Sequence, residues 1–280
     1  ISGATNNIYT INSVATSNGG TYYCKATNTC GTATTSAINF TVKSAPSLTA
    51  QSSNLVLCLS QQANFSVTAT GTTPITYKWY KDNSLISGAV LSTYTISSVA
   101  TTDAGIYYCV ITNSCGSINS STKTLTVNTT PSIASQSASD SVCLGASKSF
   151  SITATGSAPI TYQWYYNTTS NAISGATNNF YTINAVGTSN GGSYYCKASN
   201  SCGDATTSQI NLTIKTAPAL TSQSSNLVLC LGQQANFSVT ATGTAPIAYS
   251  WYKDNTLISG AVASTYTISS VSTTDAGNYY

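Results

Sequence analysis

The sequence repeats itself with a period of 172 residues, and this repetition constrains the fold more than any other feature. The heptapeptide ISGATNN begins at Ile1 and again at Ile173, and SSNLVLCL begins at Ser52 and again at Ser224. Similarity at a fixed period indicates an array of structural units. Shorter spacings of 85 and 87 residues separate the tryptophans, which are Trp79, Trp164 and Trp251. Each 172-residue unit is therefore expected to contain two similar domains.

Within each domain, short runs rich in Val, Ile, Thr and Tyr alternate with turn residues. No stretch of useful length shows the 3.6-residue period of an amphipathic helix. In one domain the runs predict strands near residues 55–59, 63–70, 75–80, 93–97, 105–112 and 117–127. Turns are predicted at residues 71–74, 81–83, 101–105 and 113–116. Roughly seven strands in about 85 residues is the scale of a two-sheet β-sandwich.

A short motif identifies the kind of sandwich. Asp103, Gly105, Tyr107 and Cys109 resemble the D-x-G-x-Y-x-C signature of immunoglobulin domains. The tryptophans resemble the buried tryptophan of the third strand, and the corner tyrosines would be Tyr22, Tyr107, Tyr194 and Tyr279. The third domain has Asn190 and Gly192 at the positions of Asp103 and Gly105, which weakens the turn signature there but not the fold. The resemblance covers the whole chain and implies an all-β fold of tandem immunoglobulin-like β-sandwiches arranged head to tail as a rod.

The alignment of the repeats divides the chain into four segments. Residues 1–43 are the C-terminal part of one domain, 44–128 and 129–215 are complete domains, and 216–280 are the N-terminal part of a fourth. The joints KSAPSL, NTTPSI and KTAPAL are short and contain no Gly/Ser-rich linker. We therefore expect neighbouring domains to touch and form a semi-rigid rod, with about 40 Å of length per domain.

The nine cysteines do not fit the usual bridge of the resembled family. That family places a cysteine on the second strand, 12 residues before the tryptophan, where this chain has Val67, Ile152 and Val239. The inter-sheet disulfide therefore cannot form. We expect the sixth-strand cysteines to be small buried hydrophobic residues; they are Cys24, Cys109 and Cys196.

The other six cysteines are the disulfide candidates. Cys58, Cys143 and Cys230 precede the second strand, and Cys30, Cys115 and Cys202 occupy the last hairpin. In the resembled fold these two positions lie at opposite ends of a domain, too far apart for a disulfide. The resemblance therefore implies a bridge between domains, from Cys58 to Cys202, with equivalent joints at the other end cysteines. A shifted strand register would instead join Cys58 to Cys115 within one domain. Either bridge requires an oxidising compartment, so we expect the chain to be secreted or on a cell surface.

Composition excludes several functions. Charged residues make up 5% of the chain, the net charge is +3, and His, Arg, Glu and Met are absent. The chain therefore has no imidazole for acid–base catalysis or zinc binding, and no guanidinium for phosphate recognition. We predict no enzyme activity, no cofactor, no metal site and no binding to nucleic acid. No apolar run approaches the length of a membrane helix, so we expect no membrane insertion within this segment.

Two surface features suggest contacts or modification. The run LVLCL at residues 55–59 recurs at 227–231 and would lie at an exposed sheet edge. Its leucines would dock on another chain, or they would be buried against their own domain or the adjacent joint; they are Leu55, Leu57, Leu59, Leu227, Leu229 and Leu231. The triplet Asp140-Ser141-Val142 resembles the short O-glycosylation motif of Bacteroidetes secreted proteins, which makes Ser141 a candidate site.

The whole pattern resembles tandem immunoglobulin-like arrays of bacterial surface proteins, including adhesins and stalks. The resemblance implies a non-catalytic extracellular structural repeat that forms a rod, stalk or filament of an adhesin-like protein. Its expected partner is another copy, in a filament or lateral bundle. The alternative is a recognition module whose loops bind a glycan or a protein.

Overall fold

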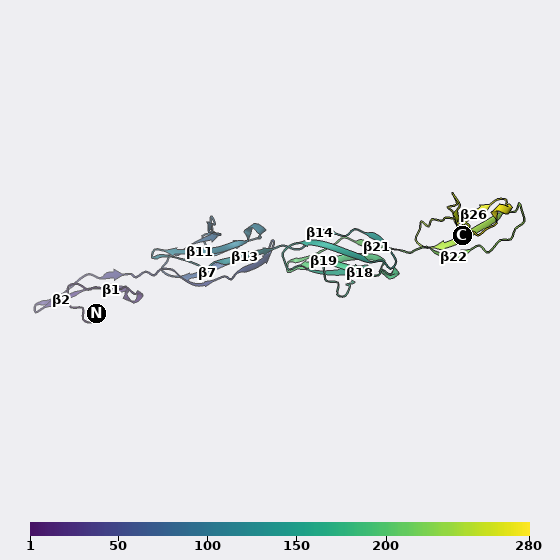
Figure 1. The fold of residues 1–280 in the computed structure, drawn as a ribbon. Coiled ribbons are helices and arrows are strands. Elements are labelled where there is room, and N and C mark those ends of the chain that lie inside the picture. Colours follow the sequence, from purple (N-terminus) through teal and green to yellow (C-terminus); the bar gives the residue numbers. More distant parts are fainter. The chain divides into compact units, whose positions relative to one another are not determined.

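A computed structural model describes residues 1–280, and it consists of strands joined by turns and four short 3₁₀ helices (Figure 1). It divides into two units, Ile1–Thr130 and Pro131–Tyr280, which are described separately. Each unit contains one complete two-sheet sandwich and one incomplete one. The all-β architecture agrees with the sequence prediction.

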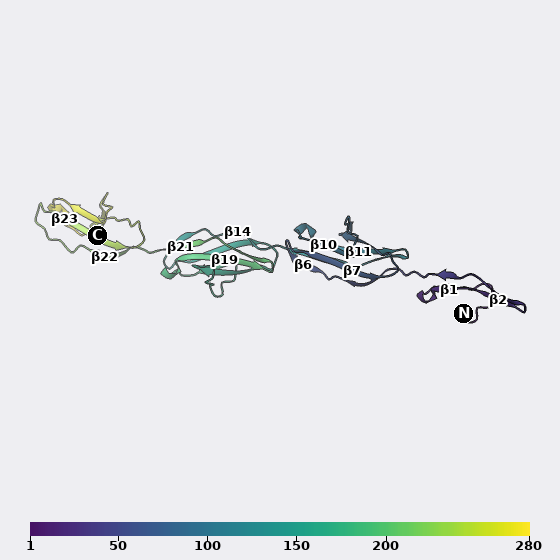
Figure 2. The same cartoon turned by 180° about the vertical axis from the view of Figure 1, so that it is seen from behind.

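The complete sandwich of the first unit has two sheets, one of three strands and one larger. Figure 2 shows the same fold from behind. The smaller sheet has the order β10-β7-β5, with β5 (Ser47–Gln51), β7 (Ala63–Thr70) and β10 (Thr93–Ile96). The larger has the order β6-β13-β11-β8-β9, with β6 (Leu55–Cys58), β8 (Thr76–Lys81), β9 (Ser84–Leu85), β11 (Gly105–Asn113) and β13 (Lys123–Asn128). β12 (Gly116–Asn119) also pairs with β11.

All six strands predicted for this sandwich are present, with one important difference. The run expected as a single strand over 117–127 is split into β12 and β13. The split occurs because the backbone N–H of Ser120 donates to the carbonyl of Cys109, while the Ser120 hydroxyl accepts from the N–H of Cys109 at 2.9 Å. Two strands, β5 and β9, were not predicted.

Strand alternation builds the core. In β7 the residues Ala63, Phe65 and Val67 are buried and those between them are exposed, which is the period of a strand with one face on the core. Across the interior lies β11, whose Tyr107 ring stacks on Phe65 with centroids 4.5 Å apart. Trp79 from β8 completes the aromatic centre and is 2% exposed.

The second unit repeats this plan in residues 131–215. One sheet has the order β14-β16-β18, with β14 (Ser132–Gln136), β16 (Lys148–Thr155) and β18 (Phe180–Ile183). The other has the order β15-β21-β19-β17, with β15 (Asp140–Cys143), β17 (Thr161–Tyr166), β19 (Gly192–Asn200) and β21 (Ile210–Lys215), and β20 (Gly203–Thr206) pairs with β19. Its separate core is centred on Phe150, Trp164 and Tyr194.

The tyrosine corner is present in every segment. The Tyr107 hydroxyl donates to the Asp103 carbonyl at 2.7 Å, just after η2 (Thr101–Asp103). In the second sandwich Tyr194 donates to Asn190 at 2.8 Å, after η3 (Thr188–Asn190). The Asn190 side chain accepts a hydrogen bond from the Gly187 N–H at 2.7 Å, and the Asp103 carboxylate accepts one from the Ala100 N–H at 2.8 Å. Asparagine therefore supports the same corner as aspartate, because the turn needs an acceptor oxygen and not a charge.

The end segments are partial sandwiches. Residues 1–43 contain η1 (Thr16–Asn18) and four strands. Of these, β1 (Gly20–Tyr22) pairs with β4 (Ile38–Phe40), and β2 (Lys25–Asn28) pairs with β3 (Gly31–Thr34). Residues 216–280 contain the sheet β22-β23-β26 and the hairpin β24-β25, with β22 (Ala219–Gln223), β23 (Ala235–Thr242), β24 (Tyr252–Lys253), β25 (Thr256–Leu257), β26 (Thr265–Ile268) and η4 (Thr273–Asp275). Neither segment contains all the strands found in the two complete sandwiches.

Candidate functional site

The sixth-strand cysteines occupy the core in both complete sandwiches. Cys109 and Cys196 are fully buried, and the side chains at the usual bridge position are Val67 and Ile152, in the same two cores. Burial raises the pKa of Cys109 to about 11 and that of Cys196 to about 12. Both thiols therefore remain protonated and unreactive near neutral pH.

Cys24 differs from this expectation, since it is exposed. Its backbone N–H is held by the Thr35 hydroxyl at 2.9 Å, which matches the bond from Cys196 to Thr207. The local strand geometry is therefore the same. The side chain is uncovered because residues 1–43 contain no counterpart of the sheet that covers Cys196.

One end of the first complete sandwich carries Cys58. This residue is the last of β6 and lies opposite Asn128, the last residue of β13. The next backbone N–H, from Leu59, donates to the Asn128 carbonyl at 2.8 Å. Cys58 therefore lies at the end where the domain finishes.

The opposite end carries the β11–β12 hairpin with Cys115. The hairpin residue Asn113 donates through its side-chain amide to the carbonyls of Ser44 and Thr72, at 2.8 and 2.9 Å. The Ser44 N–H in turn donates to the Thr72 hydroxyl at 2.8 Å. Ser44 lies just before β5, the first strand of this sandwich, so Cys115 and Cys58 lie at opposite ends. Cys115 is a free thiol, so the alternative bridge from Cys58 to Cys115 is not formed.

The second sandwich has the same arrangement. Cys143 ends β15 opposite Lys215, at the domain's final strand. Cys202 lies in the β19–β20 hairpin, where its N–H is bound by Asn200, whose amide donates to the Ser157 carbonyl at 2.9 Å. Cys58 and Cys202 are each disulfide-bonded. The other seven cysteines are free thiols: Cys24, Cys30, Cys109, Cys115, Cys143, Cys196 and Cys230.

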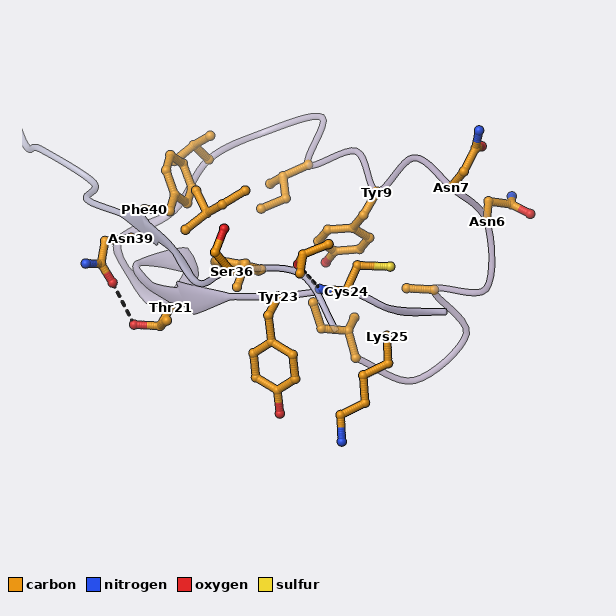
Figure 3. A pocket seen from close by; sticks show the side chains of 17 residues that line it. Asn6, Asn7, Tyr9, Thr21, Tyr23, Cys24, Lys25, Ser36, Asn39 and Phe40 are labelled. Atoms are coloured by element: carbon orange, nitrogen blue, oxygen red, sulfur yellow. Dashed lines mark hydrogen bonds between the residues drawn. The ribbon is translucent and has the colours of Figure 1, made fainter. Parts of the chain in front are cut away.

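One hollow lies in residues 1–43, and Figure 3 shows Tyr9, Cys24 and Phe40 around it. Its lining residues Tyr22, Cys24 and Ile38 are the repeat counterparts of Tyr194, Cys196 and Ile210, which are core residues of the second sandwich. A second hollow, in residues 216–280, is lined by counterparts of the first sandwich's core in the same way. Both hollows are uncovered sandwich interiors, not ligand sites.

The LVLCL run divides between the two faces of its strand. Leu55 and Leu57 pack against the core of their own domain, whereas Val56 between them is 67% exposed. Leu59 follows the strand and is 47% exposed. The leucines of the second LVLCL run have no strand equivalent to β13 beside them and are also exposed; they are Leu227, Leu229 and Leu231. For Leu55 and Leu57 the structure favours burial within the domain over docking on another chain.

The candidate glycosylation residue Ser141 lies within β15, paired with Thr213 of β21, and is half-buried. Its neighbour Asp140 forms an ion pair with Lys148 at 2.6 Å, and this contact lowers the pKa of the exposed Asp140 carboxyl. Ser141 thus lies on a paired strand and not in an open loop.

A pair of outward tyrosines was not predicted from the sequence. Tyr80 of β8 lies opposite Tyr108 of β11, and their rings stack with centroids 5.0 Å apart and an interplanar angle of 5°. In the second sandwich, Tyr165 of β17 lies opposite Tyr195 of β19 at the equivalent positions. The signal was present in the doubled aromatics WY and YYC, because consecutive strand residues point to opposite faces.

The described residues contain no cluster of three or more potential metal ligands. None of the helices in the structure has the length and apolar character needed to cross a membrane.

A family model described as "Immunoglobulin domain" matches residues 45–113, 130–200 and 217–280. The chain belongs to the immunoglobulin-domain family. The three matches fall in the segments that contain Trp79, Trp164 and Trp251. This membership, with the topology above, confirms the family resemblance drawn from the sequence motifs.

Several animal proteins contain similar immunoglobulin regions. Human hemicentin-1 is 29% identical over 85% of this chain, and rat roundabout homolog 1 is 26% identical over 87%. The mouse cell adhesion molecule DSCAML1 is 26% identical over 89% of the chain. The chain spans only 4%, 16% and 13% of these three proteins respectively.

Solved structures support the fold. The I67–I69 fragment of titin superposes with a TM-score of 0.65 at 23% identity, covering 84% of this chain and 92% of the fragment. Immunoglobulin domains 1–5 of Sidekick-1 give a TM-score of 0.52 at 20% identity, covering 95% of this chain and 63% of that one. At these identities the likeness establishes architecture alone.

Proposed function

We propose that this chain is a non-catalytic extracellular structural repeat that forms the rod or stalk of a surface adhesin-like protein, stapled by disulfides between successive domains. The observation that carries the proposal is the placement of the non-core cysteines. Each complete sandwich has one cysteine where its last strand ends and another in the hairpin beside its first residues.

The first step concerns the bridge itself. Cys58 lies at the end of the 44–128 domain, and Cys202 lies in the hairpin at the start of the next domain. Head-to-tail stacking would bring these two ends together and would pair Cys58 with Cys202. The fact that both are disulfide-bonded supports this pairing.

The same rule accounts for the free end cysteines. If the 172-residue repeat continues, the hairpin partner of Cys143 is the counterpart of Cys115, at position 287. The partner of Cys115 is the counterpart of Cys143, which precedes Ile1. Cys30 and Cys230 likewise pair with cysteines of neighbouring repeats. The bridges would then form a ladder along the whole array.

The joints support stiffness. The first residue of the 44–128 domain, Ser44, is held by Thr72 and Asn113. Thr216 is held in the same way, donating its N–H to the Thr244 hydroxyl at 2.8 Å. Joint residues bonded to a folded domain cannot act as a flexible coil.

Composition supports the remaining parts of the proposal. A disulfide ladder persists only in an oxidising compartment, so the array is extracellular or on the cell surface. With 5% charged residues, little repulsion opposes side-by-side contact between copies in a filament or bundle. The Asn, Thr and Ser-rich, Lys-only composition resembles bacterial surface arrays, although the relatives named above are animal proteins. The structure offers no specific feature that favours a loop-borne glycan site.

A tryptic map of the non-reduced chain tests the pairing, because lysines separate the relevant cysteines. Cys58 lies in peptide 44–78, Cys202 in 198–215 and Cys115 in 82–123. The expected species joins 44–78 to 198–215 and disappears on reduction. A species joining 44–78 to 82–123 would refute the ladder, and the Cys58→Ser variant serves as the control.

Small-angle scattering tests the rod. A compact globule of 280 residues has a radius of gyration of about 19 Å. Stacked sandwiches of about 40 Å each give a value at least about twice that. A value near that of the globule would contradict the rod whatever the disulfide map shows.

A further inference from the structure

Each hairpin cysteine follows an asparagine by two residues, in the shared sequence Asn-x-Cys-Gly. In all three hairpins the Oδ1 atom of the asparagine accepts the backbone N–H of the cysteine at 2.8 Å; the pairs are Asn28–Cys30, Asn113–Cys115 and Asn200–Cys202. This is the hydrogen bond of an Asx turn, in which the side chain binds the backbone two residues further on. The asparagine therefore fixes the part of the turn that carries the cysteine.

The other end of the same side chain binds the joint before the domain. The Nδ2 atom of Asn113 donates to the Ser44 carbonyl at 2.8 Å and to the Thr72 carbonyl at 2.9 Å. Ser44 and Thr72 are also bonded to each other, because the Ser44 N–H donates to the Thr72 hydroxyl and the Thr72 N–H donates to the Ser44 carbonyl. One asparagine side chain thus connects the hairpin cysteine to the joint, and we call this arrangement the joint clamp.

The second complete sandwich contains the same parts. Asn200 donates to the Ser157 carbonyl at 2.9 Å, and Ser157 is the repeat counterpart of Thr72. The counterpart of Ser44, at the joint before this sandwich, is Thr129. The joint clamp is therefore a property of the repeat and not of one domain.

The other cysteine of the proposed bridge is tied to this joint from the preceding domain. Cys58 is the last residue of β6, and the N–H of the next residue, Leu59, donates to the Asn128 carbonyl at 2.8 Å. Asn128 is directly followed by Thr129. The residue after Cys143 makes the equivalent bond at 2.7 Å. Each complete domain therefore anchors its end cysteine to the last residue before the next joint.

We infer that Asn200 is a positioning residue for the disulfide bond between Cys58 and Cys202, because its amide holds Thr129 as the sister hairpin holds Ser44. The two cysteines are then anchored to consecutive residues of one joint. Thiols that are already held close lose less conformational freedom when they bond, so their disulfide is harder to reduce. The inference rests on the proposed ladder and names the residue that directs its pairing.

The joint clamp also provides selection among thiols. Exposed free thiols elsewhere in the chain can compete for Cys58 by thiol–disulfide exchange; they are Cys24, Cys30, Cys115, Cys143 and Cys230. Local sequence does not separate Cys115 from Cys202, since both lie in Asn-Ser-Cys-Gly hairpins. The difference lies in the joint that each hairpin binds. Asn113 holds Cys115 at the joint before the 44–128 domain, whereas Cys58 lies at the other end of that domain.

The equilibrium of the full chain with mixtures of reduced and oxidised glutathione tests the inference. After rapid alkylation and tryptic digestion, the species joining 44–78 to 198–215 is measured against the two separate peptides. Asn200→Ala removes both ends of the joint clamp, and Asn200→Asp keeps an acceptor for the Cys202 N–H but loses the donor to the joint. The control Asn113→Ala removes the same bonds from the sister hairpin, whose Cys115 is a free thiol.

Both Asn200 variants are expected to shift the Cys58–Cys202 equilibrium towards thiols by about tenfold, the scale of one or two lost hydrogen bonds. For this two-electron couple, that shift is about 30 mV in reduction potential. Asn113→Ala should leave the equilibrium unchanged. Thermal unfolding of the fully reduced chains checks that every variant is folded without the bridge.

Two results would overturn the inference alone. One is an Asn200→Asp chain with the wild-type equilibrium, because the bond to the joint would then have no part in pairing. The other is a shift of equal size in Asn113→Ala, which would reduce the effect to general loosening of a hairpin. A wild type that lacks the linked species would overturn the ladder together with the inference, so the two failures are distinguishable.

Discussion

Restoring the missing inter-sheet bridge tests the account of the core cysteines. In the 44–128 domain, Val67 of β7 and Cys109 of β11 lie in the same core, on strands of opposite sheets. They are 5% and 0% exposed. The change Val67→Cys should allow a disulfide to Cys109 when the domain folds under oxidising conditions.

The expected gain can be worked from the loop that the bridge closes. A loop of about 43 residues restricts the unfolded chain by about 4 kcal/mol at 25 °C. The smaller side chain in place of Val67 costs about 1 kcal/mol. The net gain of about 3 kcal/mol should raise the melting temperature of this domain by more than about 10 °C.

Calorimetry of the oxidised Val67→Cys chain against the oxidised wild type measures this gain, because the disulfide bonds of Cys58 and Cys202 are intact in both. Mass spectrometry of the 44–78 and 82–123 tryptic peptides confirms the bond. The control Val67→Cys/Cys109→Ala has no cysteine pair in this core, so it should show only the destabilisation caused by the smaller side chains. A variant that stays reduced after oxidative refolding would refute the placement of the two residues opposite each other.

Three further outcomes are expected. Tyr107→Phe removes the bond to the Asp103 carbonyl and should cost about 1–2 kcal/mol of unfolding free energy, measured by denaturant titration; a loss below about 0.3 kcal/mol would contradict a structural role for the corner. Burial raises the pKa of Tyr107 and of Cys109, so stability is complete below the unfolded-state values and falls as the pH rises above about 9–10, and Tyr107→Phe should reduce this slope; an unchanged slope would show that other groups cause the loss. Asn113→Ala frees the Ser44 carbonyl and should increase amide hydrogen exchange at Ser44 and Ala45 with little change at β7. Equal exchange in both chains would show that the hairpin does not hold the joint.

The sequence predicted the strands most accurately where the alternation was strong. β7 was predicted at its observed bounds, because apolar and polar residues alternate without interruption from Ala63 to Thr70. β5 was missed because Ser47–Gln51 has only one large apolar residue, Leu48, and it is held mainly by pairing with β7. The break between β12 and β13 was missed because it depends on Ser120 bonding to Cys109 from a different strand.

The placement of the candidate residues was less predictable. Family resemblance located the core cysteines correctly in the complete domains, since their position on the sixth strand fixes the face on which they lie. It could not identify Val56 as the outward residue of the LVLCL run, because a continuous apolar run gives no sign of which side faces the core. The parallel register of β6 with β13 decides that, with Val56 opposite Thr126.

By itself, the sequence determined that this chain is a series of two-sheet domains with a 172-residue period, because periodicity and turn chemistry act over a few neighbouring residues. Only the tertiary structure decided which residues meet. Tyr80 and Tyr108 are 28 positions apart and form one stacked pair because the register of β8 against β11 aligns them. Cys58 and Cys115 are separated because their strands end at opposite ends of the sandwich. Such relations depend on how distant strands pair, and no local pattern in the chain encodes them.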